Sequence, residues 1–237
     1  MTSVVPTPDI TPPPTQDELP CDDGIPMESQ RHKMQMDLLL DTLQFWLDQR
    51  EDGYISGNMF VYFSTRQIRN QDFRGPDFFA VVGVPKKERK SWVVWEEGQA
   101  PNVVIELLSD STRNEDKTWK KEIYQNQLRV PEYFWYDPFN PEDWAGFYLK
   151  GGEYEPLERD RNNRYISHEL GLALVQWFGT YKDVETVWLR WETLEGELLP
   201  TERELSQQAQ QQAQQAQQKN EKLAAKLLEL GIDPDEL

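Results

Sequence analysis

Two acidic residues interrupt apolar segments that otherwise have the composition of buried β-strands. Asp77 precedes the run Phe78–Val82, and Glu106 lies inside the run Val103–Leu108. An unpaired carboxylate in such surroundings is costly to desolvate. A divalent cation removes that cost by binding carboxylate oxygens, which Mg²⁺ and Mn²⁺ prefer as ligands. The pair therefore predicts a metal site. A turn capped by Asp77 and a buried salt bridge of Glu106 form an alternative interpretation that the pattern supports about equally.

A lysine on the following segment can complete this chemistry. Ser111-Thr112 offers an N-cap for a helix that extends to about Gln127. On such a helix Asp116, Lys120 and Tyr124 follow one another at i, i+4 spacing and share one face. A lysine there can orient or activate a metal-bound water. An ordinary solvated Asp–Lys pair is the alternative, and it is the more common meaning of a single i, i+4 pair.

The overall charge opposes tight binding to nucleic acid, but two local clusters are basic. The chain has 42 acidic and 25 basic residues and a net charge of −17. Phosphate neutralisation needs clustered Lys and Arg. The clusters are Lys86, Lys87, Arg89 and Lys90 in one predicted loop, and Arg113, Lys117, Lys120 and Lys121 further along. We interpret the first cluster and Arg113 as candidate nucleic-acid contacts, although a solvated loop is the more common meaning of such a cluster.

The two histidines carry no comparable signal. His32 and His168 are far apart in the sequence and have no metal-ligand spacing around them. We interpret both as surface or cap residues. The sequence also has no Gly-rich phosphate loop, nucleophile elbow or Cys–His cluster.

Composition divides the chain into three parts. Residues 1–30 form a Pro-rich leader that we expect to be disordered, residues 31–200 form one α/β domain, and residues 201–237 form a helical tail. The single Cys21 can form no internal disulfide, so a reducing cytoplasm is expected. No apolar run is long enough to span a bilayer, and we expect no membrane association.

The periodicity within the domain predicts an alternation of helices and strands. Apolar residues at helical spacing from Arg31 predict a helix that Asp52-Gly53 ends. Strands are predicted at 59–63, 78–82, 92–95, 103–108, 133–136 and 185–191, with a β-meander at 146–150, 154–157 and 164–166. The predicted strand at 92–95 is an edge strand, and that at 103–108 is central because it is apolar on both faces.

The tail has the spacing of a coiled coil. Residues at roughly heptad positions are Leu205, Ala209, Gln212, Ala216, Lys219, Leu223 and either Lys226 or Leu227. This pattern predicts a helix that pairs with a copy of itself, so a homodimer is expected. The Ala-rich half is a weak seam, and stable pairing would depend on Leu223, Leu227, Leu228 and Leu230. A lone low-complexity helix is the alternative.

Several motifs together resemble a known family. They are Pro76-Asp77, Val104–Ser109, Ser111-Thr112-Arg113 with Asp116, Lys120 and Tyr124, Pro131-Glu132-Tyr133, and Asp137-Pro138. In this combination and spacing they resemble the Uma family of bacterial putative restriction endonucleases. Phe60–Phe63, Gly83-Val84-Pro85 and Ser91–Glu97 are similar to the same family. The resemblance covers roughly residues 35–200.

The resemblance implies a fold and a site. The fold is that of PD-(D/E)XK nucleases, a restriction-endonuclease-like mixed central sheet flanked by helices, here with a C-terminal coiled-coil helix. Asp77, Glu106 and the backbone carbonyl of Leu107 are then the metal ligands, with Ser109 in support. The superfamily pattern places a lysine where this chain has Leu108, so Lys120 is similar to a catalytic lysine that has migrated to the next helix. Asp116 and Tyr124 would support Lys120.

The function expected from the resemblance is Mg²⁺-dependent hydrolysis of phosphodiester bonds in DNA by a homodimer. A dimer is suited to the cleavage of two strands. Two alternatives remain. One is a non-catalytic interaction scaffold that keeps the fold, and the other is a nuclease for RNA or branched nucleic acid. The acidic balance and the absence of lysine at position 108 favour the scaffold.

Overall fold

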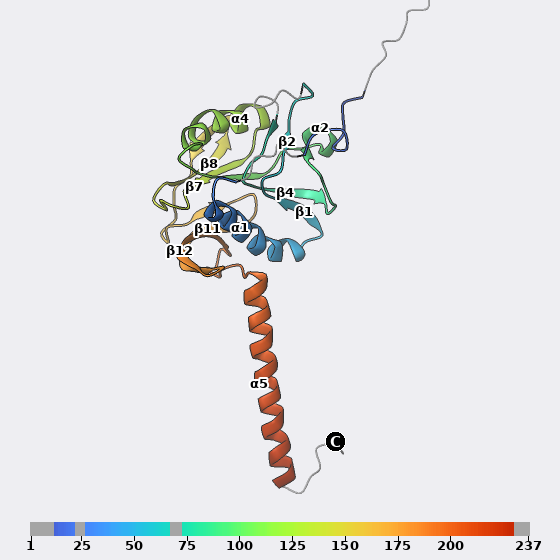
Figure 1. The fold of residues 1–237 in the computed structure, drawn as a ribbon, viewed down its shortest axis with the longest axis vertical. Coiled ribbons are helices and arrows are strands. Elements are labelled where there is room, and N and C mark those ends of the chain that lie inside the picture. Colours follow the sequence, from blue (N-terminus) through green and yellow to red (C-terminus); the bar gives the residue numbers. More distant parts are fainter. Residues whose placement is uncertain (1–11, 22–26, 67–72, 230–237) are drawn as a thin grey trace, which may run out of the picture.

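A mixed six-stranded sheet forms the centre of the molecule (Figure 1). The structure is a computed structural model and describes residues 12–21, 27–66 and 73–229. The strand order is β1-β4-β6-β7-β8-β9, in which β6 and β7 are parallel and the other neighbours are antiparallel. The strands are β1 (Asp52–Ser56), β4 (Phe78–Pro85), β6 (Val103–Leu107), β7 (Glu132–Tyr136), β8 (Trp144–Lys150) and β9 (Glu153–Pro156).

Two three-stranded sheets accompany the central sheet. One has the order β10-β11-β12, with β10 (Tyr165–Ser167), β11 (Leu172–Tyr181) and β12 (Val184–Glu192). The other has the order β3-β2-β5, with β2 (Val61–Tyr62), β3 (Phe73–Arg74) and β5 (Trp92–Val93), and is followed by the short helix α2 (Val94–Glu97).

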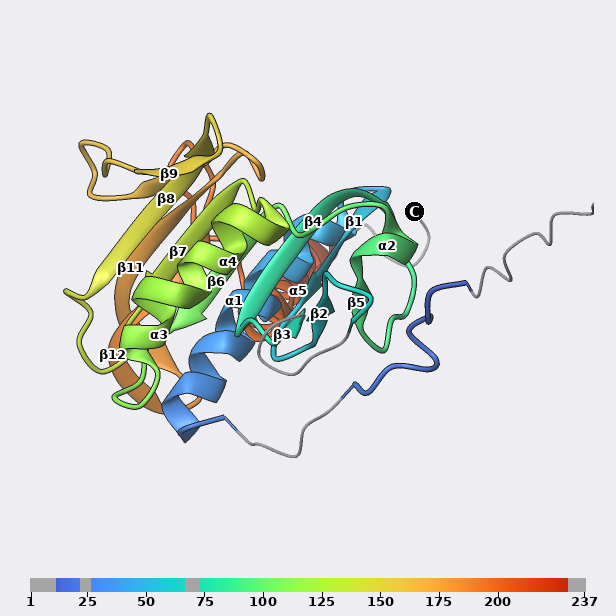
Figure 2. The same ribbon diagram turned by 90° about the horizontal axis from the view of Figure 1, so that it is seen from above.

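Helices cover the two faces of the central sheet (Figure 2). Helix α1 (Gln30–Asp48) packs on one face with the β10-β11-β12 sheet, because Leu39, Phe78 and Trp191 share one buried cluster. A continuous helical segment covers the other face. It consists of α3 (Arg113–Glu115), the π-helical turn η1 (Asp116–Lys120), α4 (Lys121–Ile123) and the π-helical turn η2 (Tyr124–Leu128). This α3–η2 helix buries Ile123 against the opposite side of β4 and β6.

The predicted α/β class and mixed sheet are therefore confirmed, with local differences. The predicted third strand of the meander becomes β10, which pairs with β11 in a separate sheet. Strand β11, its partner, is not among the strands predicted from the sequence. The predicted edge strand at 92–95 ends at Val93, because Gly98 in a left-handed conformation donates to the Val94 carbonyl and closes a helical turn.

Residues 12–21, which fall in the predicted disordered leader, lie against the β3-β2-β5 sheet. Leu19 is buried with Phe60 and Tyr62. The backbone carbonyl of Pro14 accepts a hydrogen bond from Trp95 Nε1, at 2.8 Å. This part of the leader is held on the domain because its apolar side chain packs in the cluster and its backbone carbonyl accepts a hydrogen bond. The polar composition on which the prediction of disorder was based does not reveal them.

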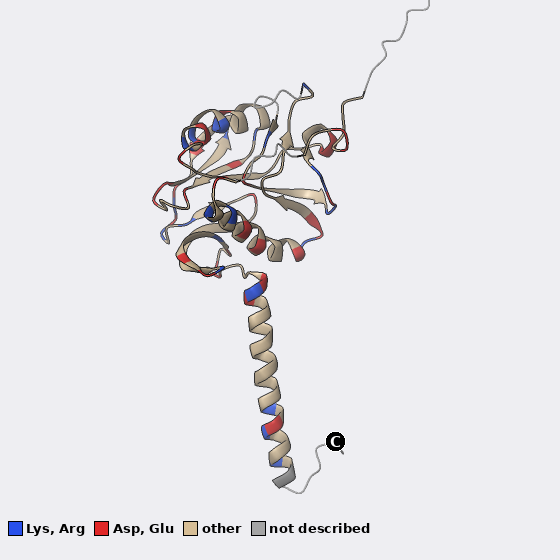
Figure 3. Cartoon of the chain, viewed as in Figure 1, with Lys and Arg blue, Asp and Glu red and all other residues tan. Residues whose placement is uncertain are grey.

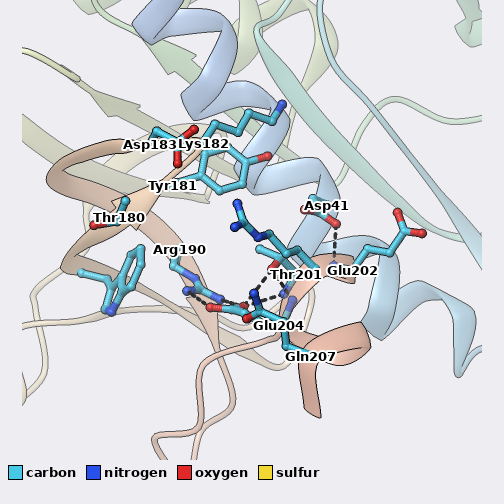
Figure 4. A pocket seen from close by; sticks show the side chains of 12 residues that line it. Asp41, Thr180, Tyr181, Lys182, Asp183, Arg190, Thr201, Glu202, Glu204 and Gln207 are labelled. Carbon is cyan, nitrogen blue, oxygen red and sulfur yellow. Dashed lines mark hydrogen bonds and ion pairs between the residues drawn. The ribbon is translucent and has the colours of Figure 1, made fainter. Parts of the chain in front are cut away.

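Helix α5 (Glu202–Glu229) projects from the globular domain (Figure 1). Its first turn is fixed by a reciprocal cap, in which Glu204 N donates to Thr201 Oγ1 and Thr201 N donates to Glu204 Oε2. The guanidinium of Arg190, a buried β12 residue, also donates to both Glu204 carboxylate oxygens, at 3.1 and 2.8 Å (Figure 4). The helix therefore leaves the domain in a defined direction. No helix in the described part of the chain is both long and apolar enough to cross a membrane.

Candidate functional site

The register of the central sheet brings Asp77 and Glu106 together. Phe78 pairs with Ile105 in the antiparallel β4–β6 ladder, so Asp77 falls opposite Glu106 one step further. Directly opposed residues have side chains on the same face, with Cβ atoms about 5 Å apart. That face is the one covered by the α3–η2 helix. The two carboxylates therefore converge beneath this helix.

The backbone around Asp77 is fixed from two sides. Leu107 N donates to Asp77 Oδ2 at 2.7 Å, which ties the aspartate to the end of β6. On the other side, a Cβ atom at Gly57 would lie 2.6 Å from the Asp77 carbonyl oxygen. Only glycine allows this close approach.

The α3–η2 helix adds an ammonium and a phenol to the acid pair. Lys120 Nζ lies 3.3 Å from Glu106 Oε2 and 2.5 Å from Asp116 Oδ1. Tyr124 OH donates to Glu106 Oε1 at 2.7 Å. Both Glu106 and Asp116 are 1% exposed, so the charges meet away from bulk water. Lys120 ends η1 and Tyr124 begins η2, and such π-helical turns are frequent at functional sites.

Negative charge exceeds positive charge in this cluster. Burial raises the pKa of the Asp77 carboxyl well above its ordinary value, and Glu106 raises it further. Burial, and after it Glu106, raises the pKa of Asp116 to about 6. Burial lowers the pKa of Lys120, but Glu106, Asp116 and Asp77 together raise it above its ordinary value. The lysine is therefore a cation at neutral pH, and one ammonium faces three carboxyl groups.

This donor set fits a hard divalent cation. Asp77 and Glu106 supply oxygen ligands on one face, and the excess negative charge is of the kind that a divalent cation neutralises. Among residues 12–21, 27–66 and 73–229, no set of three His, Cys, Asp or Glu side chains is arranged to hold a metal ion. Two carboxylates suffice for Mg²⁺, which usually keeps several waters and binds proteins through one or two carboxylates.

Ser109, predicted as a supporting residue, lies in the turn between β6 and the α3–η2 helix. It is 8% exposed, and its hydroxyl lies 3.0 Å from Ser111 Oγ and 2.9 Å from Thr112 Oγ1. It also accepts a hydrogen bond from Thr112 N at 3.2 Å, whereas Thr112 makes no side-chain cap. Ser109, rather than the predicted Ser111-Thr112 cap, therefore accepts a hydrogen bond from a free backbone N–H at the start of the helix.

His32 is a residue of this region that sequence reasoning missed. It is 3% exposed, and its Nε2 lies 3.0 Å from the carbonyl oxygen of Leu108, two residues after Glu106. Since a carbonyl only accepts, Nε2 carries the proton and Nδ1 accepts from Ser29 Oγ at 2.7 Å. Ser29 is the N-cap of α1, so the spacing of Ser29 and His32 signals a helix start but not the long-range bond to β6.

The predicted nucleic-acid role of Arg89 needs correction. Its side chain is 0% exposed, and its guanidinium donates to both carboxylate oxygens of Glu97, at 2.9 and 2.8 Å. It also lies over the ring of Trp92. A buried and paired guanidinium holds the β5–α2 region together and cannot contact a phosphate.

The other members of this basic cluster lie at the far end of β4. Lys86 donates to the Leu47 carbonyl, Lys87 pairs with Glu97 and Lys90 pairs with Asp17. They follow Pro85, whereas Asp77 precedes the first residue of the strand. Eight extended residues span about 25 Å, so this loop is remote from the acid pair.

Arg113, also predicted as a nucleic-acid contact, lies at the helix start beside the site. Its guanidinium donates to Asp137 Oδ2 at 2.5 Å and to Asp143. Lys117 donates to Asp143 at 2.6 Å. Both cations therefore have carboxylate partners within the protein.

The comparisons with known proteins show the family of the chain. Residues 18–181 match the model of the family described as Uma2, "Putative restriction endonuclease". The chain belongs to the Uma2 family. The resemblance inferred from the motifs is thereby confirmed. A solved structure of a putative nuclease belonging to DUF820, from Anabaena variabilis, is similar, with a TM-score of 0.45, 16% identity, and coverage of 67% of this chain and 91% of that one. No curated protein matches.

Proposed function

We propose that this Uma2 protein is a Mg²⁺- or Mn²⁺-dependent endonuclease that hydrolyses phosphodiester bonds in DNA. One observation carries the proposal. A lysine lies 3.3 Å from Glu106 Oε2 on the face of the sheet where Asp77 stands opposite Glu106. Two carboxylates and an ammonium in one buried cluster are the groups that metal-assisted phosphoryl hydrolysis needs. Membership of a family described as putative restriction endonucleases supports it.

Each residue has a distinct role in this proposal. Asp77 and Glu106, with the backbone carbonyl of Leu107, would hold the cation. A bound divalent cation supplies a water of lowered pKa and neutralises charge that develops on phosphate. Lys120, already protonated, orients the water or stabilises the phosphate and does not accept a proton.

Asp116 and Tyr124 are positioning residues. Asp116 fixes the ammonium of Lys120 at 2.5 Å, and Tyr124 fixes the carboxylate of Glu106 at 2.7 Å. Burial and Glu106 raise the pKa of the Tyr124 phenol well above its ordinary value, so it remains a donor at neutral pH.

Nicking of supercoiled plasmid by the purified chain tests the proposal. We expect cleavage with Mg²⁺ or Mn²⁺ and none with a chelator. Asp77→Asn and Glu106→Gln should reduce it to background, and Lys120→Met should slow it about 100-fold or more. Glu155→Gln and Lys150→Met remove members of a surface ion pair on β8 and β9 and should leave the rate unchanged. Equal cleavage by Asp77→Asn and by the wild type would exclude this site.

A non-catalytic scaffold is the second candidate, favoured by a specific feature. Both carboxylate oxygens of Glu106 already have partners inside the protein, Tyr124 and Lys120. A closed network of this kind can be purely structural. Titration calorimetry with Mn²⁺ distinguishes the two candidates. Binding that Asp77→Asn abolishes supports the nuclease, and the absence of binding supports the scaffold.

We further propose that the chain acts in the cytoplasm as a homodimer joined through α5. The lone Cys21 is exposed and unpaired, in keeping with a reducing compartment. Beyond its anchored first turn, the described side chains of α5 are exposed or half-buried, so the helix face is open to a partner helix.

A further inference from the structure

Phe139 presents an aromatic ring to solvent on a tightly held turn after β7. The residue is 59% exposed. Its backbone N–H and that of Asn140 both donate to Asp137 Oδ1, at 2.8 and 3.1 Å. The turn closes where Asp143 N donates to the Asn140 carbonyl and Asp137 N donates to the Asp143 carbonyl. The ring is thus held in the open by a constrained backbone.

This turn lies at the same sheet edge as the acid pair. In the parallel β6–β7 ladder, Leu107 pairs with Tyr136, so the residues that follow Glu106 emerge beside those that precede Phe139. His32 connects them. Its ring centroid lies 5.7 Å from that of Phe139, and its Nε2 lies 3.0 Å from the Leu108 carbonyl oxygen. One side chain therefore separates Phe139 from Leu108, which follows β6. This connection lies on the α1 side of the sheet, and Glu106, two residues before Leu108, faces the α3–η2 helix on the other side.

The guanidinium of Arg31 accompanies the ring. The guanidinium carbon of Arg31 lies 4.7 Å from the ring centroid of Phe139. In the part of the chain that the structure describes, Arg31 forms no ion pair, whereas Arg113 and Lys117 at the same edge pair with Asp137 and Asp143. A hollow of about 240 Å³ lies beside Phe139, with Arg31, Met34 and Val184 among its lining residues.

We propose that Phe139 and Arg31 form a platform on which an unpaired base of a DNA strand stacks while a neighbouring phosphate lies at the acid pair. The inference rests on the proposed nuclease function and specifies its substrate. Aromatic rings stack on bases of any sequence, and an arginine adds cation–π attraction and a phosphate contact. Inside a duplex the base faces are covered by their neighbours. A protruding ring therefore selects single-stranded, frayed or branched DNA over intact duplex.

Fluorescence anisotropy with a labelled single-stranded oligonucleotide and a blunt hairpin of the same composition tests the platform. Ca²⁺, which takes similar oxygen ligands, is present throughout. We expect Phe139→Ala to weaken single-strand binding about 5- to 100-fold and hairpin binding by less than about twofold. Phe139→Trp should restore the affinity. Arg31→Gln should reduce the slope of log K against log salt by about 0.7, the value for one phosphate of a single strand.

Phe178 is the matched control, because it is an equally large ring, 68% exposed, on β11. Phe178→Ala should leave both affinities unchanged. Thermal unfolding of Phe139→Ala at the wild-type temperature will show that the truncation leaves the fold intact.

Three results would overturn the platform. In the first, Phe139→Ala binds the single strand as tightly as the wild type does. In the second, Phe139→Ala loses as much affinity for the hairpin as for the single strand. In the third, the protein binds the RNA version of the oligonucleotide but not the DNA version. The binding assay does not depend on cleavage. Binding that depends on Phe139, without any nicking, would therefore refute the nuclease proposal and support the platform. Nicking, with binding that does not depend on Phe139, would support the nuclease proposal and refute the platform.

Discussion

At the scale of single residues, the facing carboxylates of the site are expected to lower the stability of the protein when no metal ion is bound. Asp77 and Glu106 carry like charges opposite one another in a low-dielectric setting, and burial opposes the ionisation of Asp77. Acidic side chains are rarely buried without a positive partner, because an uncompensated buried charge is costly. The cation proposed above would balance this pair.

Asp77→Asn should therefore stabilise the metal-free protein. The amide oxygen still accepts from Leu107 N, while the buried charge and its repulsion with Glu106 disappear. We expect a gain of about 1–2 kcal/mol in the free energy of unfolding, or about 3–6 °C in Tm. Added Mn²⁺ should raise the Tm of the wild type and not that of the variant.

Asp137→Asn is the matched control for this experiment. Asp137 is buried and bonds Arg113 and the Phe139 N–H, and the same guanidinium pairs with Asp143, the carboxylate that stands opposite Asp137. Its loss should lower the Tm, because a buried charge-assisted bond is removed. A fall in Tm for both variants would mean that Asp77 is a structural acid and not a metal ligand.

A second buried acid allows the pH dependence of stability to be tested away from the site. Burial raises the pKa of Glu132, although Ser167 and the His168 N–H donate to it and act in the opposite direction. The folded state thus favours the protonated carboxyl. The cost of ionisation is absent below the unfolded pKa, grows as pH rises and is fully present above the folded pKa.

Glu132→Gln removes this titration while keeping a hydrogen-bonding group of the same shape. Relative to the variant, the wild type should be more stable near about pH 4.5 than near about pH 8. Urea unfolding of both proteins at several pH values measures the difference. A gap that stays constant, or that widens in favour of the wild type as pH rises, contradicts this assignment.

At the scale of elements, local patterns predicted more than long-range pairing. Apolar runs identified β4, β6 and β7, and the i, i+4 stripe identified the helix face that carries Lys120, because these signals reside in neighbouring residues. Whether Asp77 and Glu106 share a face depends on the antiparallel register of β4 and β6, which a single sequence does not encode locally. The resemblance to the Uma family supplied the pairing that periodicity could not.

The errors have the same physical origin. Arg89 was grouped with its lysine neighbours because charge clusters are visible in sequence, whereas its partner Glu97 becomes evident only after β5 and α2 fold together. His32 was interpreted as a surface or cap residue because no metal-ligand spacing surrounds it in the sequence. Its hydrogen bond joins it to Leu108, 76 residues away, so no local pattern reveals it. The strand at 164–166 was predicted to join the meander of 146–150 and 154–157, because its true partner, β11, was not among the predicted strands.

At the scale of the whole molecule, the sequence of α5 predicts how the two chains of the proposed homodimer would pair. Between Glu204 and Lys219 the helix carries no charge (Figure 3). The continuous helix presents a stripe at alternating four- and three-residue steps, made of Ala209, Ala213, Ala216, Asn220, Leu223 and Leu227. It keeps four positions of the predicted seam, Ala209, Ala216, Leu223 and Leu227, and replaces Gln212 and Lys219 by Ala213 and Asn220. Lys219 and Lys226 then lie at flanking positions.

This stripe favours two parallel strands. Asn220 and Leu227 fall at a positions and Leu223 at a d position, and a single Asn at a is known to fix register and pairing. Lys219 and Lys226 then occupy g positions. Antiparallel helices would bring these lysines against their copies, whereas parallel helices place Ala224 opposite Lys219. A parallel rod about 40 Å long would place both globular domains at one end.

Disulfide trapping tests this arrangement. In a Cys21→Ser background, Ala213→Cys places a thiol at an a position, where parallel helices bring equivalent Cα atoms within about 6–7 Å, the range of a disulfide. We expect rapid oxidation to a covalent dimer. Gln218→Cys, at the outward f position, should stay monomeric on a denaturing gel. Equal crosslinking at the two positions would reflect random collision, and none at Ala213 would mean that the helices do not pair in parallel. Leu223→Glu should shift the native mass from dimer to monomer, since it buries a charge in one of the few leucine layers of the seam.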